Sequence, residues 1–124
     1  MNDIFPEPIQ NLPEADIPLA GVKAYLCQGE NNQIIFMLFE KDVDLPEHSH
    51  DSQWEIVVEG KVELNLEGIK KIYTKGDKFY IPNGVKHSAK VYAGYASVAF
   101  FASLRSPTPW FAMISFLFPF HAVG

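Results

Sequence analysis

Two histidines separated by one residue are the most chemically suggestive feature of this 124-residue chain. His48 and His50 lie in the segment Pro-Glu-His-Ser-His-Asp-Ser-Gln over residues 46–53. On a β-strand, residues i and i+2 face the same side, so the two imidazoles would project together. Neutral imidazoles on one wall supply half of a metal site, and the alternative is a pair of exposed histidines on an edge strand. The pair therefore indicates metal binding without establishing it.

A second stretch of the chain carries a third histidine among turn-forming residues. Residues 76–87 read Gly-Asp-Lys-Phe-Tyr-Ile-Pro-Asn-Gly-Val-Lys-His. Gly76 allows a tight turn, and Pro82 and Gly84 fix an irregular bend that carries the chain to His87. One ion can be bound by all three histidines only if the strands between residues 50 and 87 bring the ring of His87 close to those of His48 and His50.

The elements that must position these rings are short strands. No convincing amphipathic helix lies within residues 21–104, where β-branched and aromatic runs alternate with turn signals. Residues 62–66 alternate apolar and polar side chains, and Glu67-Gly68 predicts a two-residue hairpin turn. Many closely spaced strands predict an all-β sandwich or barrel. The other expected strands are 22–28, 33–40, 53–59, 69–74, 78–81, 90–92 and 95–104.

The two ends of the chain differ from this central region. Residues 1–20 contain four prolines and predict an extended arm, because proline has no backbone N–H to donate. No charged residue follows Arg105, and we expect the apolar tail over 106–124 to pack on the barrel or on a second subunit. The expected organisation is therefore an arm over 1–20, a barrel over 21–105 and a tail over 106–124.

Composition and charge narrow the classes of partner. The net charge is −5 and no basic stripe is present, which argues against a nucleic-acid partner. The apolar run over residues 110–120 is too short for a membrane-spanning helix, which needs about 20 residues. The N-terminus lacks the pattern of a signal peptide, so we expect a cytoplasmic protein. Cys27 is the only cysteine, which excludes a disulfide framework, and we expect it to be a small core residue.

The two histidine stretches together resemble the motifs of the cupin superfamily. The first cupin motif, G-x5-H-x-H-x3or4-E-x6-G, matches at His48, His50 and Gly60, with Asp42 in place of the opening glycine. The second motif, G-x5-P-x-G-x2-H-x3-N, has its last match at His87. It also matches at Gly76, Pro82 and Gly84. Val91 stands in place of its final asparagine. The resemblance covers residues 20–104 and implies a double-stranded β-helix, or jelly-roll barrel, whose mouth holds a metal bound by His48, His50 and His87.

The fourth ligand is where this sequence departs from the family pattern. Counting forward from His50, the acidic position of the motif falls on Glu55, whereas counting back from Gly60 it falls on Gln53. Both side chains can face inward, but they lie about 6.6 Å apart along a strand. We favour Gln53, because the strand ending at Gly60 sets the register more firmly than the loop after His50.

This choice changes the expected chemistry. Three imidazoles and an amide oxygen leave the ion its full charge for polarising a carbonyl or carboxylate, whereas Glu55 as ligand would resemble a dioxygenase-type centre. With Gln53 as ligand, Glu55 becomes the candidate catalytic base or a partner of a ligand, and the alternative is pairing with an inward Lys or Tyr. We expect His121, in the apolar tail, to be structural or exposed.

The resemblance therefore implies a metal-binding cupin with one divalent transition-metal ion (Fe, Ni, Zn, Mn or Cu) and a small-molecule ligand in the barrel. We expect a metal-dependent enzyme acting on a small oxygen-rich substrate such as a sugar acid or a diketone. The alternative is a non-catalytic module that binds a small molecule or senses a metal. Neither alternating set of the last strand, 95/97/99/101 or 96/98/100/102, carries the acid of cupins that open unsaturated uronates. We expect a homodimer, because open jelly rolls have sheet edges to protect.

Overall fold

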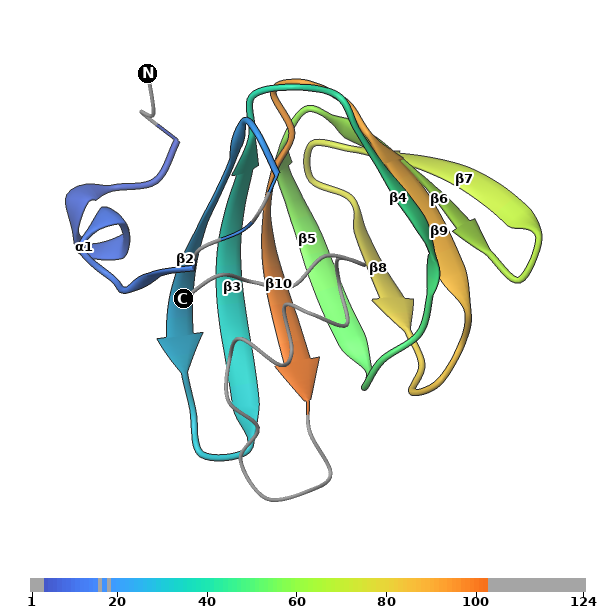
Figure 1. Ribbon diagram of the computed structural model, residues 1–124, viewed down its shortest axis with the longest axis horizontal. Coiled ribbons are helices and arrows are strands. Elements are labelled where there is room, and N and C mark those ends of the chain that lie inside the picture. The colour runs from blue at the N-terminus through green and yellow to red at the C-terminus, as the bar shows by residue number, and fades with distance from the viewer. Residues whose placement is uncertain (1–3, 16, 18, 103–124) are drawn as a thin grey trace.

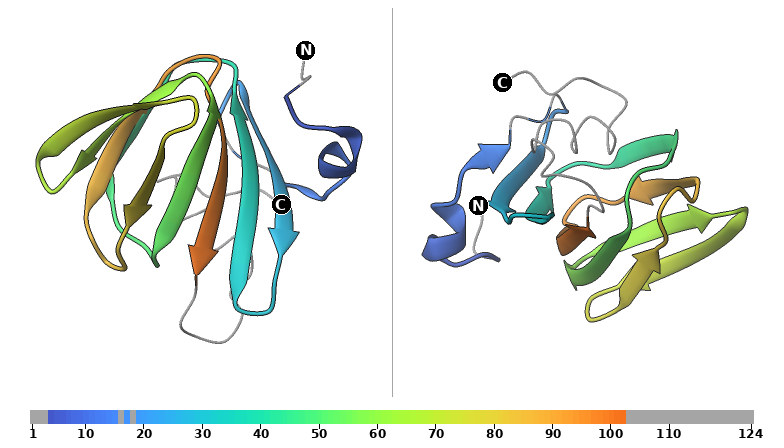
Figure 2. Two further views of the ribbon diagram at one scale, coloured as in Figure 1. Left: turned by 180° about the vertical axis from the view of Figure 1, so that it is seen from behind. Right: turned by 90° about the horizontal axis from the view of Figure 1, so that it is seen from below.

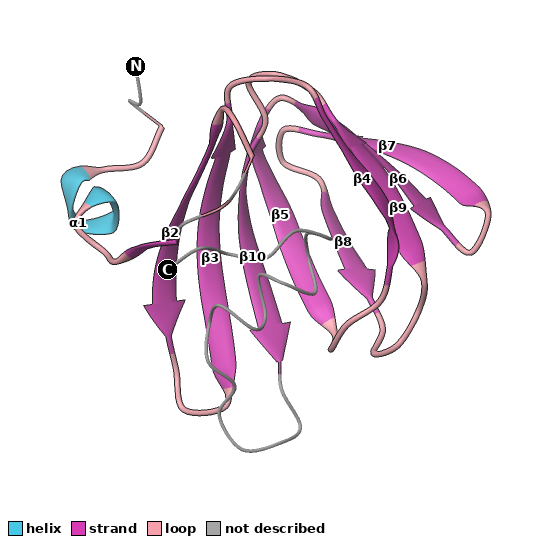
Figure 3. Cartoon of the chain, viewed as in Figure 1, coloured by secondary structure: helices cyan, strands magenta, loops and turns pink. Residues whose placement is uncertain are grey.

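The computed structural model of the chain describes residues 4–15, 17 and 19–102, which are almost entirely β-sheet (Figure 1, Figure 3). Among the described residues, no helix has the length and hydropathy of a membrane-spanning segment. The elements are α1 (Glu7–Gln10), β1 (Glu14–Ala15), β2 (Val22–Gln28), β3 (Asn32–Phe39), β4 (Val43–His48), β5 (Gln53–Glu59), β6 (Lys61–Leu66), β7 (Ile69–Thr74), β8 (Lys78–Ile81), β9 (His87–Val91) and β10 (Ala96–Ala102).

The strands form two antiparallel sheets that face each other across a core (Figure 1, Figure 2). The six-stranded sheet has the order β1-β2-β3-β10-β5-β8, and the four-stranded sheet has the order β4-β9-β6-β7. Apolar side chains of both sheets fill the space between them, among them Ile35, Phe39 and Val57 from the first and Val62 and Leu64 from the second. The predicted all-β jelly-roll barrel is confirmed.

The register of the six-stranded sheet settles which side chains of β10 face inward. Ser97, Ala99 and Phe101 are fully buried, and they continue the inward row that begins at Tyr95. Phe101 pairs with Gln53, and Ala99 pairs with Glu55. Adjacent inward positions on β5 therefore present an amide and a carboxyl group to the interior of the barrel.

The N-terminal arm differs in part from the extended conformation that its prolines predict. Residues 7–10 form one turn of helix, with proline in the first turn, where the missing N–H has no helical partner to lose. Phe5 is 4% exposed and packs edge-on against Tyr25 and Phe36 of the six-stranded sheet. The arm thus covers part of the outer face of that sheet. The apolar tail 106–124, with His121, lies outside the described residues.

Cys27 does not lie in the core, so that prediction is wrong. Along β2 the side chains of Ala24 and Leu26 face the core, and alternation directs Cys27 to the opposite face. Tyr25 shares this outer face but is buried against Phe5 of the arm, whereas Cys27 is exposed.

Two glycines with positive φ set turns in very different surroundings. Glu67 and Gly68 have φ values of 52° and 83°, so the predicted two-residue hairpin turn between β6 and β7 is confirmed. A Cβ on Gly68 would meet no atom within 4 Å. Gly60 has a φ of 76°, and a Cβ there would lie 2.7 Å from the Cα of Tyr95 and 2.8 Å from the carbonyl oxygen of Gly94. The turn at Gly60 therefore allows the chain to approach the backbone just before β10.

Substituting these two glycines separates backbone strain from steric overlap. We expect Gly68→Ala to lower the free energy of unfolding by about 1 kcal/mol, because only the positive φ opposes it. Gly60→Ala must also displace backbone atoms, so we expect a loss of about 2–4 kcal/mol. Urea unfolding of both variants measures the difference, and equal losses would contradict the close packing of Gly60 against Tyr95.

Candidate metal centre

A bulge in β4 turns His48 toward the interior. Leu45 pairs with Ala89 and His48 pairs with His87, so β4 contains one residue more than β9 between the two pairs. An extra residue reverses the alternation of a strand, and Leu45 and His48 accordingly both line the central cavity. Without the bulge, Glu47 would face inward instead. Pro46 lies within this bulge, as a strand proline often does, but the position of the extra residue is defined only by the pairing with β9.

His50 reaches the same place from a loop, although the sequence predicts both histidines on one strand. β4 ends at His48, and His50 lies in the connection to β5. Two contacts hold it there. Its carbonyl oxygen accepts a hydrogen bond of 2.9 Å from the N–H of Gly84, and its ring packs edge-on against Phe101 with centroids 5.4 Å apart. The bond to Gly84 ties this loop to the bend that leads into His87.

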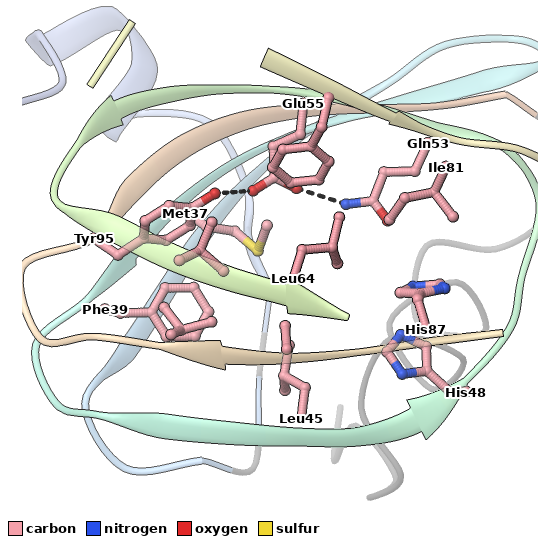
Figure 4. A pocket seen from close by; sticks show the side chains of 14 residues that line it. Met37, Phe39, Leu45, His48, Gln53, Glu55, Leu64, Ile81, His87 and Tyr95 are labelled. Atoms are coloured by element: carbon pink, nitrogen blue, oxygen red, sulfur yellow. Dashed lines mark hydrogen bonds between the residues drawn. The ribbon is translucent and has the colours of Figure 1, made fainter. Parts of the chain in front are cut away.

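The three imidazole rings converge at one end of the barrel. One nitrogen from each of His48, His50 and His87 lies within 4.8 Å of the others. The ring centroids are 5.3 Å apart for His48 and His50, 4.3 Å for His48 and His87, and 4.8 Å for His50 and His87. Figure 4 shows the rings of His48 and His87 next to each other at the edge of the cavity. The structure thus brings together the three histidines that the two sequence motifs single out.

Backbone carbonyl groups fix the protonation pattern of all three rings. The Nδ1 atoms of His48, His50 and His87 lie 2.8, 2.6 and 2.9 Å from the carbonyl oxygens of Pro46, Asp51 and Val85, respectively. A carbonyl oxygen only accepts hydrogen bonds, so each neutral ring carries its proton on Nδ1. The lone pair of each ring is then on Nε2, and the Nε2 atoms of His48 and His50 are buried without a hydrogen-bond partner.

The surroundings keep these rings neutral. Burial lowers the pKa of His48 and of His87, against the opposing effect of the hydrogen bonds to Pro46 and Val85. Burial, reinforced by the two neighbouring histidines, lowers the pKa of His50 to about 4. Neutral imidazole is the form that binds a metal ion, so the cluster is in its ligand form at neutral pH.

The inward face of β5 adds a hydrogen-bonded chain of polar groups. Gln53 donates from Nε2 to Oε1 of Glu55 at 2.5 Å, and the hydroxyl group of Tyr95 donates to Oε2 of the same carboxylate (Figure 4). Burial raises the pKa of Glu55 despite these bonds, and burial and the neighbouring carboxylate raise the pKa of Tyr95. The Oε1 atom of Gln53 is buried and has no partner. The expected alternative of a tyrosine paired with Glu55 therefore occurs, and sequence reasoning did not identify which tyrosine.

The cavity beside these groups is small and largely apolar (Figure 4). Its volume is about 40 Å³, which is room for about three water molecules. His48, His87 and Gln53 lie toward one end of it, and Glu55 and Tyr95 lie toward the other (Figure 4). Its remaining walls are Met37, Phe39, Leu45, Val62, Leu64, Phe79, Ile81, Ala89 and Val91. Three imidazole nitrogens and an amide oxygen, with no cationic side chain lining the cavity in the described part of the chain, are a donor set that suits a divalent cation.

Comparison with known proteins agrees with this architecture. Residues 35–98, just over half of the chain, match the family model described as a cupin domain. An RmlC-like cupin from Shewanella frigidimarina is 28% identical with a TM-score of 0.67, over 77% of this chain and 87% of that one. KdgF from a Halomonas species is 22% identical with the same TM-score, over 77% and 92%. Oxalate decarboxylase of Bacillus subtilis, described with Mn(II) centres, is 19% identical with a TM-score of 0.63, over 77% and 28%. No curated protein matches the chain.

The lowered histidine pKa values predict how the metal-free protein responds to acid. A ring with a pKa of about 6.5 when unfolded and about 4 when folded favours the unfolded state as the pH falls through this range. We expect His50 alone to reduce the free energy of unfolding by up to about 3 kcal/mol between pH 6.5 and 4. The raised pKa of Glu55 has the opposite sign, because its contribution is lost as the pH rises.

The matched comparison is His50→Gln in chelator-treated protein, because Glu55 is present in both chains and its effect cancels. Urea unfolding at several pH values should show a smaller loss of stability toward pH 4 in the variant than in the parent. Parallel pH profiles would contradict the buried, neutral state of His50.

Proposed function

Since the chain belongs to the cupin family, we propose that it holds one divalent transition-metal ion through His48, His50, His87 and Gln53 and acts as a metal-dependent enzyme on a small oxygen-rich substrate. The observation that carries this proposal is the set of buried acceptor atoms with no partner. Nε2 of His48, Nε2 of His50 and Oε1 of Gln53 are all in this state. Buried polar atoms normally have partners, so unpartnered acceptors on the histidine cluster and on Gln53, which lines the same cavity as His48 and His87, support a ligand that bonds to all of them.

Gln53 is the proposed fourth ligand, in preference to Glu55. Both side chains are 4% exposed, but their hydrogen bonds differ. Each carboxylate oxygen of Glu55 already accepts one bond and has one lone pair left, whereas the carbonyl oxygen of Gln53 accepts no bond and has both lone pairs free. Gln53 is also the first residue of β5, directly after the loop that carries His50, and Glu55 lies about 6.6 Å further along the strand.

This donor set leaves the charge of the ion uncompensated. When bound, a divalent cation with four neutral ligands polarises a carbonyl or carboxylate group of a substrate. Imidazole ligands suit iron, nickel, zinc and copper, and manganese less well. The Mn(II) centres named for oxalate decarboxylase belong to a protein that is 19% identical, and that likeness supports the fold of this chain and not its metal.

Glu55 is the proposed catalytic residue because it is the only acidic side chain that lines the cavity among the described residues. Its raised pKa brings proton uptake closer to neutral pH, which is the property required of a general base. Each of its oxygens has a second lone pair that the bonds to Gln53 and Tyr95 leave free. In this proposal, Glu55 takes a proton from a substrate carbon or hydroxyl group, and the apolar walls exclude water from it.

The size and polarity of the cavity limit the substrate. A volume of about 40 Å³ admits only a few atoms, so most of a larger substrate stays at the mouth. No lysine or arginine lines the cavity in the described part of the chain, so a substrate carboxylate has no protein cation there to pair with. A compact carbonyl compound of the diketone type fits these walls better than a sugar acid.

The apolar walls also favour a second candidate, a non-catalytic module that binds a small molecule or senses a metal ion. In that case, the buried Glu55 has a structural role, and the ligand occupies the mouth of the barrel. A cytoplasmic location, a homodimer and the arm, barrel and tail boundaries stay predictions.

Removing one histidine tests the metal site. We expect purified protein to contain about one equivalent of a transition metal per chain, and His87→Ala to bind it 100-fold or more weakly, because a ligand is lost. Elemental analysis and competition with a chelator measure both quantities. His121→Ala is the matched control and should keep its metal. Full metal content in His87→Ala would refute the site.

Replacing the carboxylate tests catalysis. We expect metal-loaded Glu55→Gln to turn over a diketone or an unsaturated uronate at least 100-fold more slowly than the parent, because an amide does not accept the proton. The assay follows substrate loss under saturating metal. Equal rates in the two proteins would remove Glu55 from catalysis, and no turnover by either protein would favour the binding module.

A further inference from the structure

The side-chain amide of Gln53 has two ends, and only one of them can bind a cation. The carbonyl oxygen has lone pairs to offer, whereas the NH2 group only donates hydrogen bonds. The two orientations differ by a rotation of half a turn about the last side-chain bond, so a free glutamine would populate both. A ligand role for Gln53 therefore requires a second group that selects one orientation.

Glu55 is that second group. Its Oε1 lies 2.5 Å from Nε2 of Gln53, and a carboxylate oxygen only accepts. Rotating the amide would place two oxygen atoms in contact in a buried site, where both Gln53 and Glu55 are 4% exposed and repulsion is weakly screened. The orientation with the carbonyl oxygen directed away from Glu55 is thus the stable one, and this oxygen is the atom that has no partner.

Tyr95 in turn holds Glu55. Its hydroxyl group donates to Oε2, which keeps the opposite carboxylate oxygen turned toward Gln53 (Figure 4). Tyr95 is 1% exposed and packs edge-on against Phe39 with centroids 5.8 Å apart. Its backbone is fixed as well, because its carbonyl oxygen accepts from the N–H of Phe39 at 2.8 Å and its N–H donates to Tyr92 at 3.0 Å. The packing of the ring and the backbone hydrogen bonds therefore hold the Tyr95 hydroxyl group in a fixed position.

From this geometry we infer that Tyr95 and Glu55 are positioning residues that present the carbonyl oxygen of Gln53, and not its NH2 group, to the histidine cluster. The inference rests on the proposed role of Gln53 as a ligand. It gives the buried carboxylate a task that precedes any proton transfer, and it assigns a task to a tyrosine that lies 42 positions after Gln53 in the chain. Each of these three residues acts through the next, and of the three only Gln53 would contact a bound cation.

Two replacements of Glu55 with side chains of similar size separate the orientation of the Gln53 amide from the packing of residue 55. Glutamine at position 55 still offers an oxygen to Nε2 of Gln53, and the Tyr95 hydroxyl group can accept from its NH2 group. Methionine has a similar length and cannot accept in this way. We expect Glu55→Gln to bind Co²⁺ about as tightly as the parent and Glu55→Met to bind it about 10-fold to 100-fold more weakly. Chelator competition measures the affinities.

The electronic absorption spectrum of bound Co²⁺ gives a readout that general loss of packing does not reproduce. The spectrum reports the ligand set, so Glu55→Met should resemble Gln53→Leu, in which the ligand is absent, whereas Glu55→Gln should resemble the parent. Melting curves of the metal-free proteins show whether each variant folds. If Glu55→Met does not fold, Tyr95→Phe replaces it, with an expected smaller loss of affinity. Tyr80→Phe, on the exposed side of β8, is its control.

The outcomes distinguish this inference from the proposed function. Unchanged affinity and spectrum in Gln53→Leu would remove Gln53 from the ligand set and overturn the proposed site, together with the inference that depends on it. A different pair of results would overturn the inference and leave the site in place: Gln53→Leu binds more weakly, but folded Glu55→Met keeps the affinity and spectrum of the parent. Where Glu55→Met does not fold, Tyr95→Phe takes its place in this comparison.

Discussion

The anchoring of three imidazole rings by backbone carbonyl groups is the interaction on which the site depends. Each Nδ1 faces the carbonyl oxygen of a residue one or two positions away, at Pro46, Asp51 or Val85. These local bonds set the tautomer and limit ring rotation, so Nε2 is the atom left to bind. The strands then need only bring the three histidine-containing segments together, because each segment orients its own imidazole ring. A site assembled from a bulge, a loop and the start of a strand is precise for this reason.

The proposed fourth ligand, Gln53, depends on contacts within the six-stranded sheet. Gly60 has no side chain, which lets the chain approach Tyr95 closely, and the register of β5 shifts against β10 at Ala96 and Ser97. This irregularity lies where the tyrosine enters the barrel, as bulges near functional sites often do. The histidines depend on local backbone bonds, whereas Gln53 depends on a relay of side chains. The two halves of the candidate site are thus held by different physical means.

Much of the fold follows from local patterns, and the parts that do not follow depend on distant pairing. The alternation in residues 62–66 and the Glu67-Gly68 turn are encoded by neighbouring residues, and the strand over 22–28 matches β2. The short helix of the arm and the exposure of Cys27 depend on what covers the outer face of the sheet. No single segment contains that information.

The same division applies to the site. The motif spacing singles out His48, His50 and His87, and the structure brings them together. The bulge before His48 exists only relative to β9, and the bond between Tyr95 and Glu55 joins residues 40 positions apart. The order of Gln53 and Glu55 along β5 was available from the sequence, but the choice between them turns on which oxygen atoms are already bonded. Hydrogen-bond saturation is a property of the packed structure.

The kind of partner that the cluster suits follows from counting donors and acceptors. An unsatisfied buried polar atom costs about 1–3 kcal/mol, and Nε2 of His48, Nε2 of His50 and Oε1 of Gln53 are all unsatisfied. All three are acceptors, and Nε2 of His87 adds a fourth lone pair close by. One water molecule has two protons and satisfies two of these atoms, and an anion satisfies none. A cation bound by all four, as proposed, would accept electron density from each of them and so remove the whole penalty. In the proposed site, the atoms left without partners are thus the same atoms that would bind the metal ion.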